Sequence, residues 1–298
     1  MDVSVESVLG PARPGRGPAA DFLVRLFRDK PLGAAGGVIF LLFLFCGIFA
    51  GVLAPRGVND IDLVHRFAAP SLDFPLGTDR LGRDLLSRIL FGARISMIVG
   101  FCGAALSTVI SVAIGVVSGY IGGRLDMATQ RAVDGWMAFP DLVLLIVVVA
   151  VVGPGMPQII VILGLLYGIA GSRIVRGAVV SAREHMYVHS AQSIGAGTPR
   201  ILWRHILPNV MPVVIVLLTT RIGAVILSEA GLSFLGLGIP PPAPTWGSML
   251  SGSARTYMYL GPWLALVPGL CITIVVYSVN VLGDALRDLL DPRMRGAR

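Results

Sequence analysis

The sequence is poor in charged residues and has a single lysine, and both shortages exclude classes of protein. Only 14% of the 298 residues are charged and 55% are hydrophobic, which is too apolar for an ordinary soluble globule. The one lysine, Lys30, lies between Asp29 and Pro31, so the chain has no Gly-x-x-x-x-Gly-Lys-Ser/Thr loop with which to bind a nucleotide. If ATP drives this protein, it is hydrolysed on another chain.

Cysteine and histidine are also scarce. Cys46, Cys102 and Cys271 each lie inside an apolar run, without disulfide or metal-ligand spacing. His185 and His189 would share a helical face, but two ligands are too few for a metal site. No Ser/His/Asp, Cys/His or zinc-protease pattern is evident. We therefore expect no metal site, no cofactor bound by this chain and no enzymatic activity of its own.

What the sequence has in abundance is long apolar runs. Six of them occur, at roughly residues 32–54, 95–121, 137–152, 158–180, 207–231 and 263–282. Each is near the length of a membrane-spanning helix, although Pro140 and the turn at 153–155 shorten the third. The sequence therefore predicts an all-α membrane protein of about six transmembrane helices. The first run is long enough to be a retained helix rather than a cleaved signal peptide.

The basic residues fall between the runs, which explains the net charge of +7 without nucleic acid and suggests membrane lipid as the partner. They gather in the two tails and in the segments 122–136 and 172–206, which we expect on the cytoplasmic side. The predicted organisation is a cytoplasmic tail (1–31), a first transmembrane helix (32–54), an outer loop (55–94), a core domain of five helices (95–282) with a cytoplasmic loop (181–206), and a cytoplasmic tail (283–298).

The outer loop contains an amphipathic pattern. Five apolar residues recur at helical spacing opposite charged ones, which predicts a helix lying in the membrane interface: Leu81, Leu85, Leu86, Ile89 and Leu90.

The long inner loop reads as two short helices joined by a turn. Glycines at 195 and 197 break the first helix, Thr198 offers an N-cap hydroxyl, and Pro199 suits the first helical position. On the first helix Tyr187, Ala191 and Ile194 are expected to share a face, with Val188 beside it. The pattern fits equally a hairpin packed on its own protein and a docking helix for a partner.

A family resemblance enters at this loop. The stretch 187–195 (Tyr-Val-His-Ser-Ala-Gln-Ser-Ile-Gly), followed by 205–209 (His-Ile-Leu-Pro-Asn), resembles the EAA loop of ABC importer permeases. His189 and Ser190 depart from the Glu and Ala usual there. In that family the loop supplies a coupling helix that sits in a cleft of the ATPase subunit. The resemblance assigns this role to Tyr187, Val188, Ala191, Ile194, Gly195, Leu207 and Pro208.

Three further stretches resemble the DppC/OppC branch of dipeptide and oligopeptide permeases, at 75–96, 229–247 and 280–293. The second includes a proline-rich outer segment that could meet a delivery protein, with the candidate contacts Pro240, Pro241, Pro242 and Trp246. Its alternative role is that of a purely structural capping loop.

Two ionisable residues lie inside the fifth run. Arg221 and Glu229 are two helical turns apart, about 12 Å, so they cannot bond directly. Intramembrane charges are candidates for a translocation pathway, and the alternative is that they bind a neighbouring helix. Gly100, Gly103, Gly115 and Gly119 in the second run favour close helix packing, either within this chain or against a second permease.

Together the resemblances imply a type I ABC importer permease fold. The chain would be the transmembrane permease subunit that moves di- or oligopeptides into the cytoplasm by alternating access. Its partners would be a second homologous permease, two ATPase subunits that hold ATP and Mg, and an extracytoplasmic binding protein, in the bacterial inner membrane. Alternatives are an autonomous secondary transporter or channel, a membrane-embedded enzyme and, within the family, a nickel-chelate or glutathione importer permease.

Overall fold

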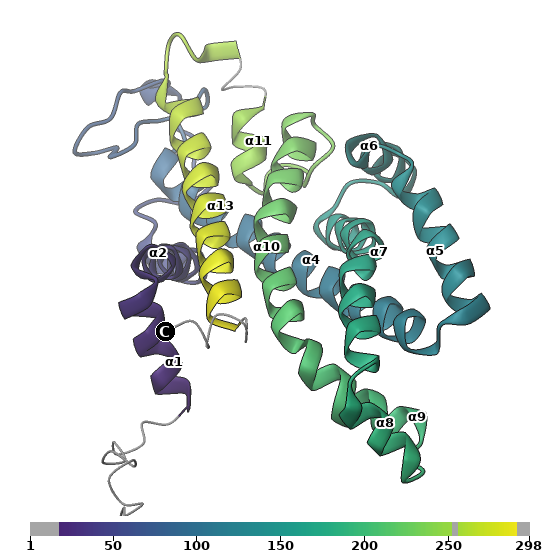
Figure 1. Ribbon diagram of the computed structural model, residues 1–298. Helices are drawn as coiled ribbons and strands as arrows, with labels where there is room; N and C mark the ends of the chain where they lie inside the picture. Colours follow the sequence, from purple (N-terminus) through teal and green to yellow (C-terminus); the bar gives the residue numbers. More distant parts are fainter. Residues whose placement is uncertain (1–17, 252–255, 291–298) are drawn as a thin grey trace, which may run out of the picture.

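The computed structural model describes residues 18–251 and 256–290, and these are mostly helical (Figure 1). The prediction of an all-α protein is confirmed: in the two ranges the only β-type pairing is the isolated bridge between Thr78 and Asp84. The elements in order are α1 (Pro18–Asp29), α2 (Pro31–Ile48), α3 (Ala50–Leu53), η2 (Leu63–His65), α4 (Leu85–Ile121), α5 (Gly123–Met137), α6 (Asp141–Val152), α7 (Met156–Arg183), α8 (Met186–Ser193), α9 (Thr198–Ile201), η3 (Leu202–Ile206), α10 (Leu207–Phe234), α11 (Trp246–Leu250) and α13 (Trp263–Leu290).

Five helical segments are long and apolar enough to cross a membrane: α2, α4, α7, the continuous segment Thr198–Phe234, and α13. The sixth is a pair, α5 and α6, which meets the criterion only as one span bent by 87°. With 12 residues α6 is about 18 Å long, too short to cross a hydrocarbon core of about 30 Å alone. The expected count of about six spans is met when this bent pair is counted as one span, and the weak third run corresponds to its second helix, α6.

The second span begins earlier than predicted. No separate amphipathic helix precedes residue 95, because α4 runs unbroken from Leu85 to Ile121. Asp84 caps it, accepting hydrogen bonds of 2.7 Å from the backbone N–H and from the hydroxyl of Ser87. Leu85 and Ile89 are buried in the protein. The helical pattern in this segment is therefore the packing face of the first turns of α4.

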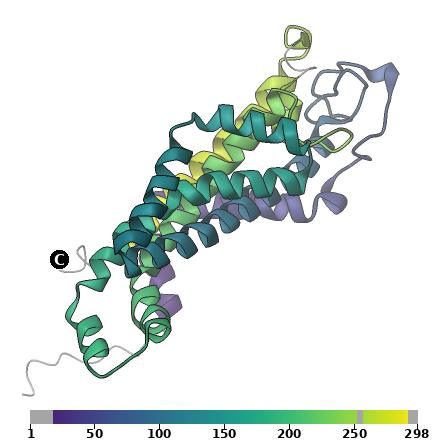
Figure 2. The ribbon, with the colours of Figure 1, turned by 90° about the vertical axis from the view of Figure 1, so that its right-hand side faces the viewer.

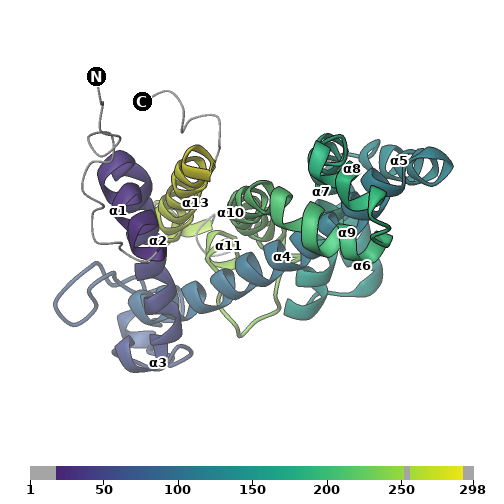
Figure 3. The same cartoon turned by 60° about the horizontal axis from the view of Figure 1, so that its bottom comes forward.

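The two ends of the described chain also differ from the predicted tails. Residues 18–29 form the amphipathic helix α1, and α13 continues through 283–290, which were expected to be tail. Lys30 forms an ion pair with Asp288, so α1, α2 and α13 lie together at one side of the molecule (Figure 3). The remainder of the predicted tails, 1–17 and 291–298, lies outside the described residues.

Helices α4 and α7 form the most extensive packed pair, and small residues allow it. The Ser111 hydroxyl of α4 donates to the Gly168 carbonyl of α7 at 2.8 Å. A Cβ at Gly115 would come within 2.7 Å of the Ser172 carbonyl oxygen. All four glycines of the predicted motif face helices of this chain, namely α7 for Gly115 and Gly119 and α10 for Gly100 and Gly103. Their role in the structure is internal packing.

A hairpin of α8 and α9 extends from one end of the bundle, beyond the ends of the spans (Figures 1 and 2). It joins α10 through η3, which is a π-helix. The Leu207 N–H donates to the Leu202 carbonyl five residues back, one residue further than in an α-helix. Segment 198–234 is thus one continuous rod that contains a single π turn.

Candidate functional site

The two helices of the hairpin are separated by a glycine turn, as the sequence predicts. Gly195 has φ +78°, and its N–H donates to Gln192 while the Ala196 N–H donates to Ala191, which is a Schellman C-terminus. The predicted start of α9 is wrong by one residue, because the N-cap is Gly197 and no side chain caps this helix. Thr198 is the first residue of α9, and Pro199 is therefore the second. Proline is tolerated there because the backbone N–H groups of the first helical turn have no acceptor within the helix.

The predicted coupling face of α8 is divided in the structure. Val188 is fully buried and Ala191 nearly so; they join a cluster with residues of α7, α9 and α10 that includes Val179 and Ile206. Ile194 lies beyond the end of α8 and is 85% exposed. The prediction that Ala191 and Ile194 share a face is therefore wrong. Helix α8 ends at Ser193, so Ile194 lies in the turn before Gly195 and not on the buried face of the helix.

Aromatic stacking and hydrogen bonds fix the hairpin to the membrane helices. The Tyr187 ring lies between those of His185 and His205, with centroids 5.6 and 6.4 Å away, and burial raises the pKa of its phenol. Arg183 donates to the Tyr120 carbonyl at 3.2 Å, which ties the start of the hairpin to the end of α4. The hairpin is consequently a packed extension of α4, α7 and α10 rather than a free loop.

Residues on the outward side of the hairpin are exposed in the described part of the chain. Met186 is 83% exposed, and with Ile194 it forms the apolar part of this side. His189, Ser190 and Ser193 are exposed around them. We call these five residues the outer hairpin surface. Pro208 is also exposed, but Leu207 is half-buried and faces a groove.

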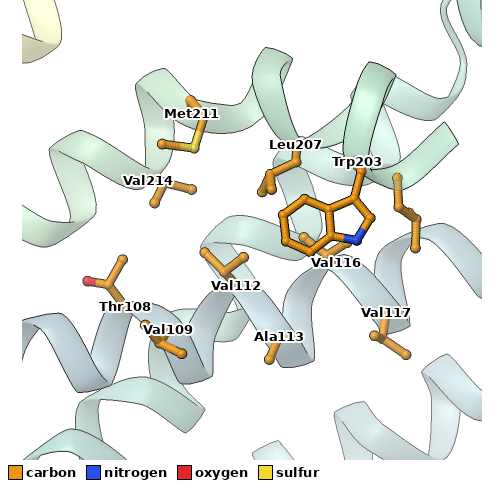
Figure 4. Close-up of a pocket in the computed structure, with 11 residues that line it drawn as sticks. Thr108, Val109, Val112, Ala113, Val116, Val117, Trp203, Leu207, Met211 and Val214 are labelled. Atoms are coloured by element: carbon orange, nitrogen blue, oxygen red, sulfur yellow. The ribbon is translucent and has the colours of Figure 1, made fainter. Parts of the chain in front are cut away.

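That groove lies between α4 and the start of α10 and has a volume of about 480 Å³ (Figure 4). All of its lining side chains but one are apolar: Thr108, Val109, Val112, Ala113, Val116, Val117, Leu202, Trp203, Leu207, Met211 and Val214. Trp203 stands at its rim beside the hairpin. An apolar groove on a membrane-spanning face suits hydrocarbon or another apolar helix rather than a polar solute.

Arg221 and Glu229 are both on α10 but differ completely in environment. Glu229 is 1% exposed; its Oε1 accepts from the Ser233 hydroxyl at 2.6 Å, and its Oε2 has no partner among the described residues. Arg221 is half-buried, with its guanidinium 5.1 Å from the centroid of the Tyr167 ring on α7. Glu229 is thus sealed inside the chain, whereas Arg221 reaches its surface.

The four candidate contacts in the outer segment also differ in their exposure. Pro240, Pro241 and Pro242 are exposed. Trp246 is fully buried, and its indole N–H donates to the Ile89 carbonyl at 3.1 Å. The prediction that Trp246 meets a delivery protein is wrong, because its large ring fills the protein interior between α11 and α4.

Ion pairs that no sequence pattern predicted hold α5 to α7. Asp126 receives two bonds from Arg176, both 2.6 Å long, and Asp134 pairs with Arg173. Arg173 and Arg176 lie inside the predicted run 158–180, and an arginine inside a span is itself a signal of a nearby acid. In the described ranges no three His, Cys, Asp or Glu side chains come close enough together to bind a metal ion.

Comparison with known proteins gives concordant results. The family described as "binding-protein-dependent transport system inner membrane component" matches residues 111–296. The dipeptide transport system permease protein DppC of Alkalihalophilus pseudofirmus is 38% identical over 268 residues, covering 90% of this chain and 88% of that protein. The glutathione transport system permease protein GsiD of Pectobacterium atrosepticum is 39% identical over 281 residues, covering 94% and 93%.

Among solved structures, an inward-facing conformation of the MetNI methionine ABC transporter matches with a TM-score of 0.57. The sequences are 17% identical, and the match covers 68% of this chain and 96% of that one. At this identity the likeness concerns the fold, which is that of a type I ABC importer permease.

Proposed function

Because the chain belongs to the family of binding-protein-dependent transport system inner membrane components, we propose that it is a permease subunit that imports peptides by alternating access, coupled to ATP hydrolysis on partner chains. The observation that carries the coupling is the hairpin of α8 and α9. It is tied to three spans, and yet its outer surface is exposed among the residues that the structure describes.

The outer hairpin surface is the docking site that we assign to an ATPase subunit. Met186 and Ile194 would enter an apolar cleft, and full burial of an isoleucine side chain favours association by about 1.5–3 kcal/mol. Val188 and Ala191 act from the other side of α8, where their packing lets the hairpin move together with α7 and α10. Tyr187, Gly195, Leu207 and Pro208 shape the hairpin and its junction with α10.

Peptides are the substrate class that the relatives favour. One is named for dipeptides and another for glutathione, and all such substrates carry free carboxylates and peptide or isopeptide bonds. Delivery would come from an extracytoplasmic binding protein that meets the exposed Pro240–Pro242 segment. ATP and Mg would be held by two ATPase subunits, and a second homologous permease would complete the pathway.

We further propose that both termini are cytoplasmic. The start of α2 and the end of α13 lie together through the Lys30–Asp288 pair. With six spans both ends would lie at the face from which the hairpin extends, and an ATPase could reach the hairpin only from the cytoplasm.

The test is purification of the assembled complex from its membrane, with ATPase activity and peptide uptake measured in proteoliposomes. Ile194→Asp should reduce recovery of the ATPase subunits by about tenfold or more, since it places a charge in an apolar cleft. Val64→Asp is the matched control, because Val64 is equally exposed but lies in the 55–84 loop. A lone chain that takes up solute without ATP would support the secondary-transporter alternative instead.

A further inference from the structure

Arg221 is a membrane-embedded cation without an ion pair. It lies at the middle of α10, where an isolated charge is costly in hydrocarbon. Among the described residues it makes no hydrogen bond or salt bridge, and its Nε is buried without an acceptor. Other half-buried arginines of the spans do have partners: Arg176 pairs with Asp126, and Arg94 donates to the Gly47 and Ile48 carbonyls. The guanidinium therefore has unused hydrogen-bond donors.

The groups around Arg221 form a polar strip across two helices. Its guanidinium stacks over the Tyr167 ring, and the Tyr167 hydroxyl lies 2.6 Å from that of Ser228, two turns further along α10. All three side chains are half-buried, so they lie at the surface of the transmembrane part of this chain. A polar strip at this depth is unfavourable against lipid, which indicates that it faces a water-filled path or a protein partner.

No acid in the described part of the chain forms an ion pair with Arg221. Glu229 is sealed behind Ser233, two turns away on a different side of α10. Asp141, at the start of α6, acts on Arg221 through its charge but forms no ion pair with it. A ligand with a carboxylate would supply what the chain lacks, since a guanidinium binds a carboxylate through charge-assisted, often bidentate, hydrogen bonds.

We propose that Arg221, with Tyr167 and Ser228, is a subsite that binds the carboxylate of the peptide while it crosses the membrane. The subsite rests on the proposed peptide-import function and deepens it. It makes the carboxylate, rather than the side chains of the peptide, the group that this chain recognises. A tyrosine ring behind the guanidinium holds it in place, and the adjacent pair of hydroxyls offers a further hydrogen bond to the same oxygens.

The experiment compares variants in the reconstituted complex with its partner permease, ATPase subunits and binding protein. Uptake of dialanine and of its C-terminal amide is measured for the wild type, for Arg221→Gln and for Arg221→Lys, with the binding protein saturated by each probe. Arg124→Gln, an exposed arginine of α5, is the matched control. Co-purification of partners and ATPase activity are followed in the same preparations.

Arg221→Gln should lower dialanine uptake by about 10- to 100-fold, the range for losing a charge-assisted hydrogen bond, and leave amide uptake within about twofold. Dialanine uptake by Arg221→Lys should lie between that of the wild type and that of Arg221→Gln. Equal uptake by Arg221→Gln and the wild type would overturn the subsite while leaving the import function standing. Loss of the second permease from the Arg221→Gln complex would also overturn the subsite, because it would mean that Arg221 forms an ion pair with an acid of that partner. A wild-type complex without ATP-dependent peptide uptake would overturn the import function itself.

Discussion

The close approach of α4 and α7 makes a quantitative prediction that can be checked against a control in the same pair of helices. Replacing Gly115 by alanine adds a Cβ 2.7 Å from the Ser172 carbonyl oxygen and 2.9 Å from the Arg176 nitrogen. Both are backbone atoms, so the helices must separate. Over-packing of this kind costs about 1–3 kcal/mol, against which the better helix propensity of alanine returns about 1 kcal/mol.

We therefore expect Gly115→Ala to destabilise the protein by up to about 2 kcal/mol. Gly177→Ala, on the exposed side of α7 with no atom within 4 Å of the added Cβ, should be neutral or stabilise by up to about 1 kcal/mol. The assay is thermal denaturation in detergent, followed by the fraction that remains monodisperse on size-exclusion chromatography. Equal melting temperatures for the two variants would refute the argument that backbone contact, and not glycine content, holds this seam together.

Three further predictions follow from contacts described above. Val188→Ala should destabilise the hairpin by about 2 kcal/mol, because Val188 is buried, whereas Ile194→Ala should change its stability by less than about 0.5 kcal/mol. Limited proteolysis between residues 186 and 206 should therefore cleave the Val188→Ala variant faster. Equal cleavage of the two variants would contradict the assigned faces. Trp246→Phe, which loses the indole hydrogen bond, should lower stability by about 1 kcal/mol and Trp246→Ala by about 3–5 kcal/mol in the same melting assay. Unchanged melting would mean that the ring is not buried in the protein interior. A double-mutant cycle of Asp126→Asn and Arg176→Gln should give a coupling of about 1 kcal/mol, and additive effects would refute the pair.

The sequence predicted the features that depend on local pattern. The apolar runs located the spans because a chain crossing hydrocarbon must satisfy its backbone hydrogen bonds within a helix. Gly195 located the turn of the hairpin because glycine takes a positive φ without strain. Motif order gave the family. Pro140 was placed inside the third run, whereas in the structure it precedes α6 and separates it from α5, a polar helix that was expected to be a loop.

What the sequence could not supply is which side of a helix is covered. Trp246 and Pro240 belong to one proline-rich motif, and yet one is buried against α4 while the other is exposed. Val188 and Ile194 were both placed on one face because α8 was assumed to continue past 193. Burial at these positions depends on helices that are distant in sequence, so the local hydrophobic periodicity cannot predict it.

The π turn between α9 and α10 sets the rotational phase of the hairpin. It holds one residue more than an α turn, so deleting any one residue from Leu202–Ile206 would let the rod continue as uniform α-helix. Because a π turn and an α turn each complete about one rotation, such a deletion would leave the hairpin pointing in nearly the same direction. If the same five residues took α-helical geometry without a deletion, the hairpin would instead turn around the axis of α10 by about 100°, the angle of one residue. A change of helix type in this short segment would therefore redirect the outer hairpin surface while both helices remain intact.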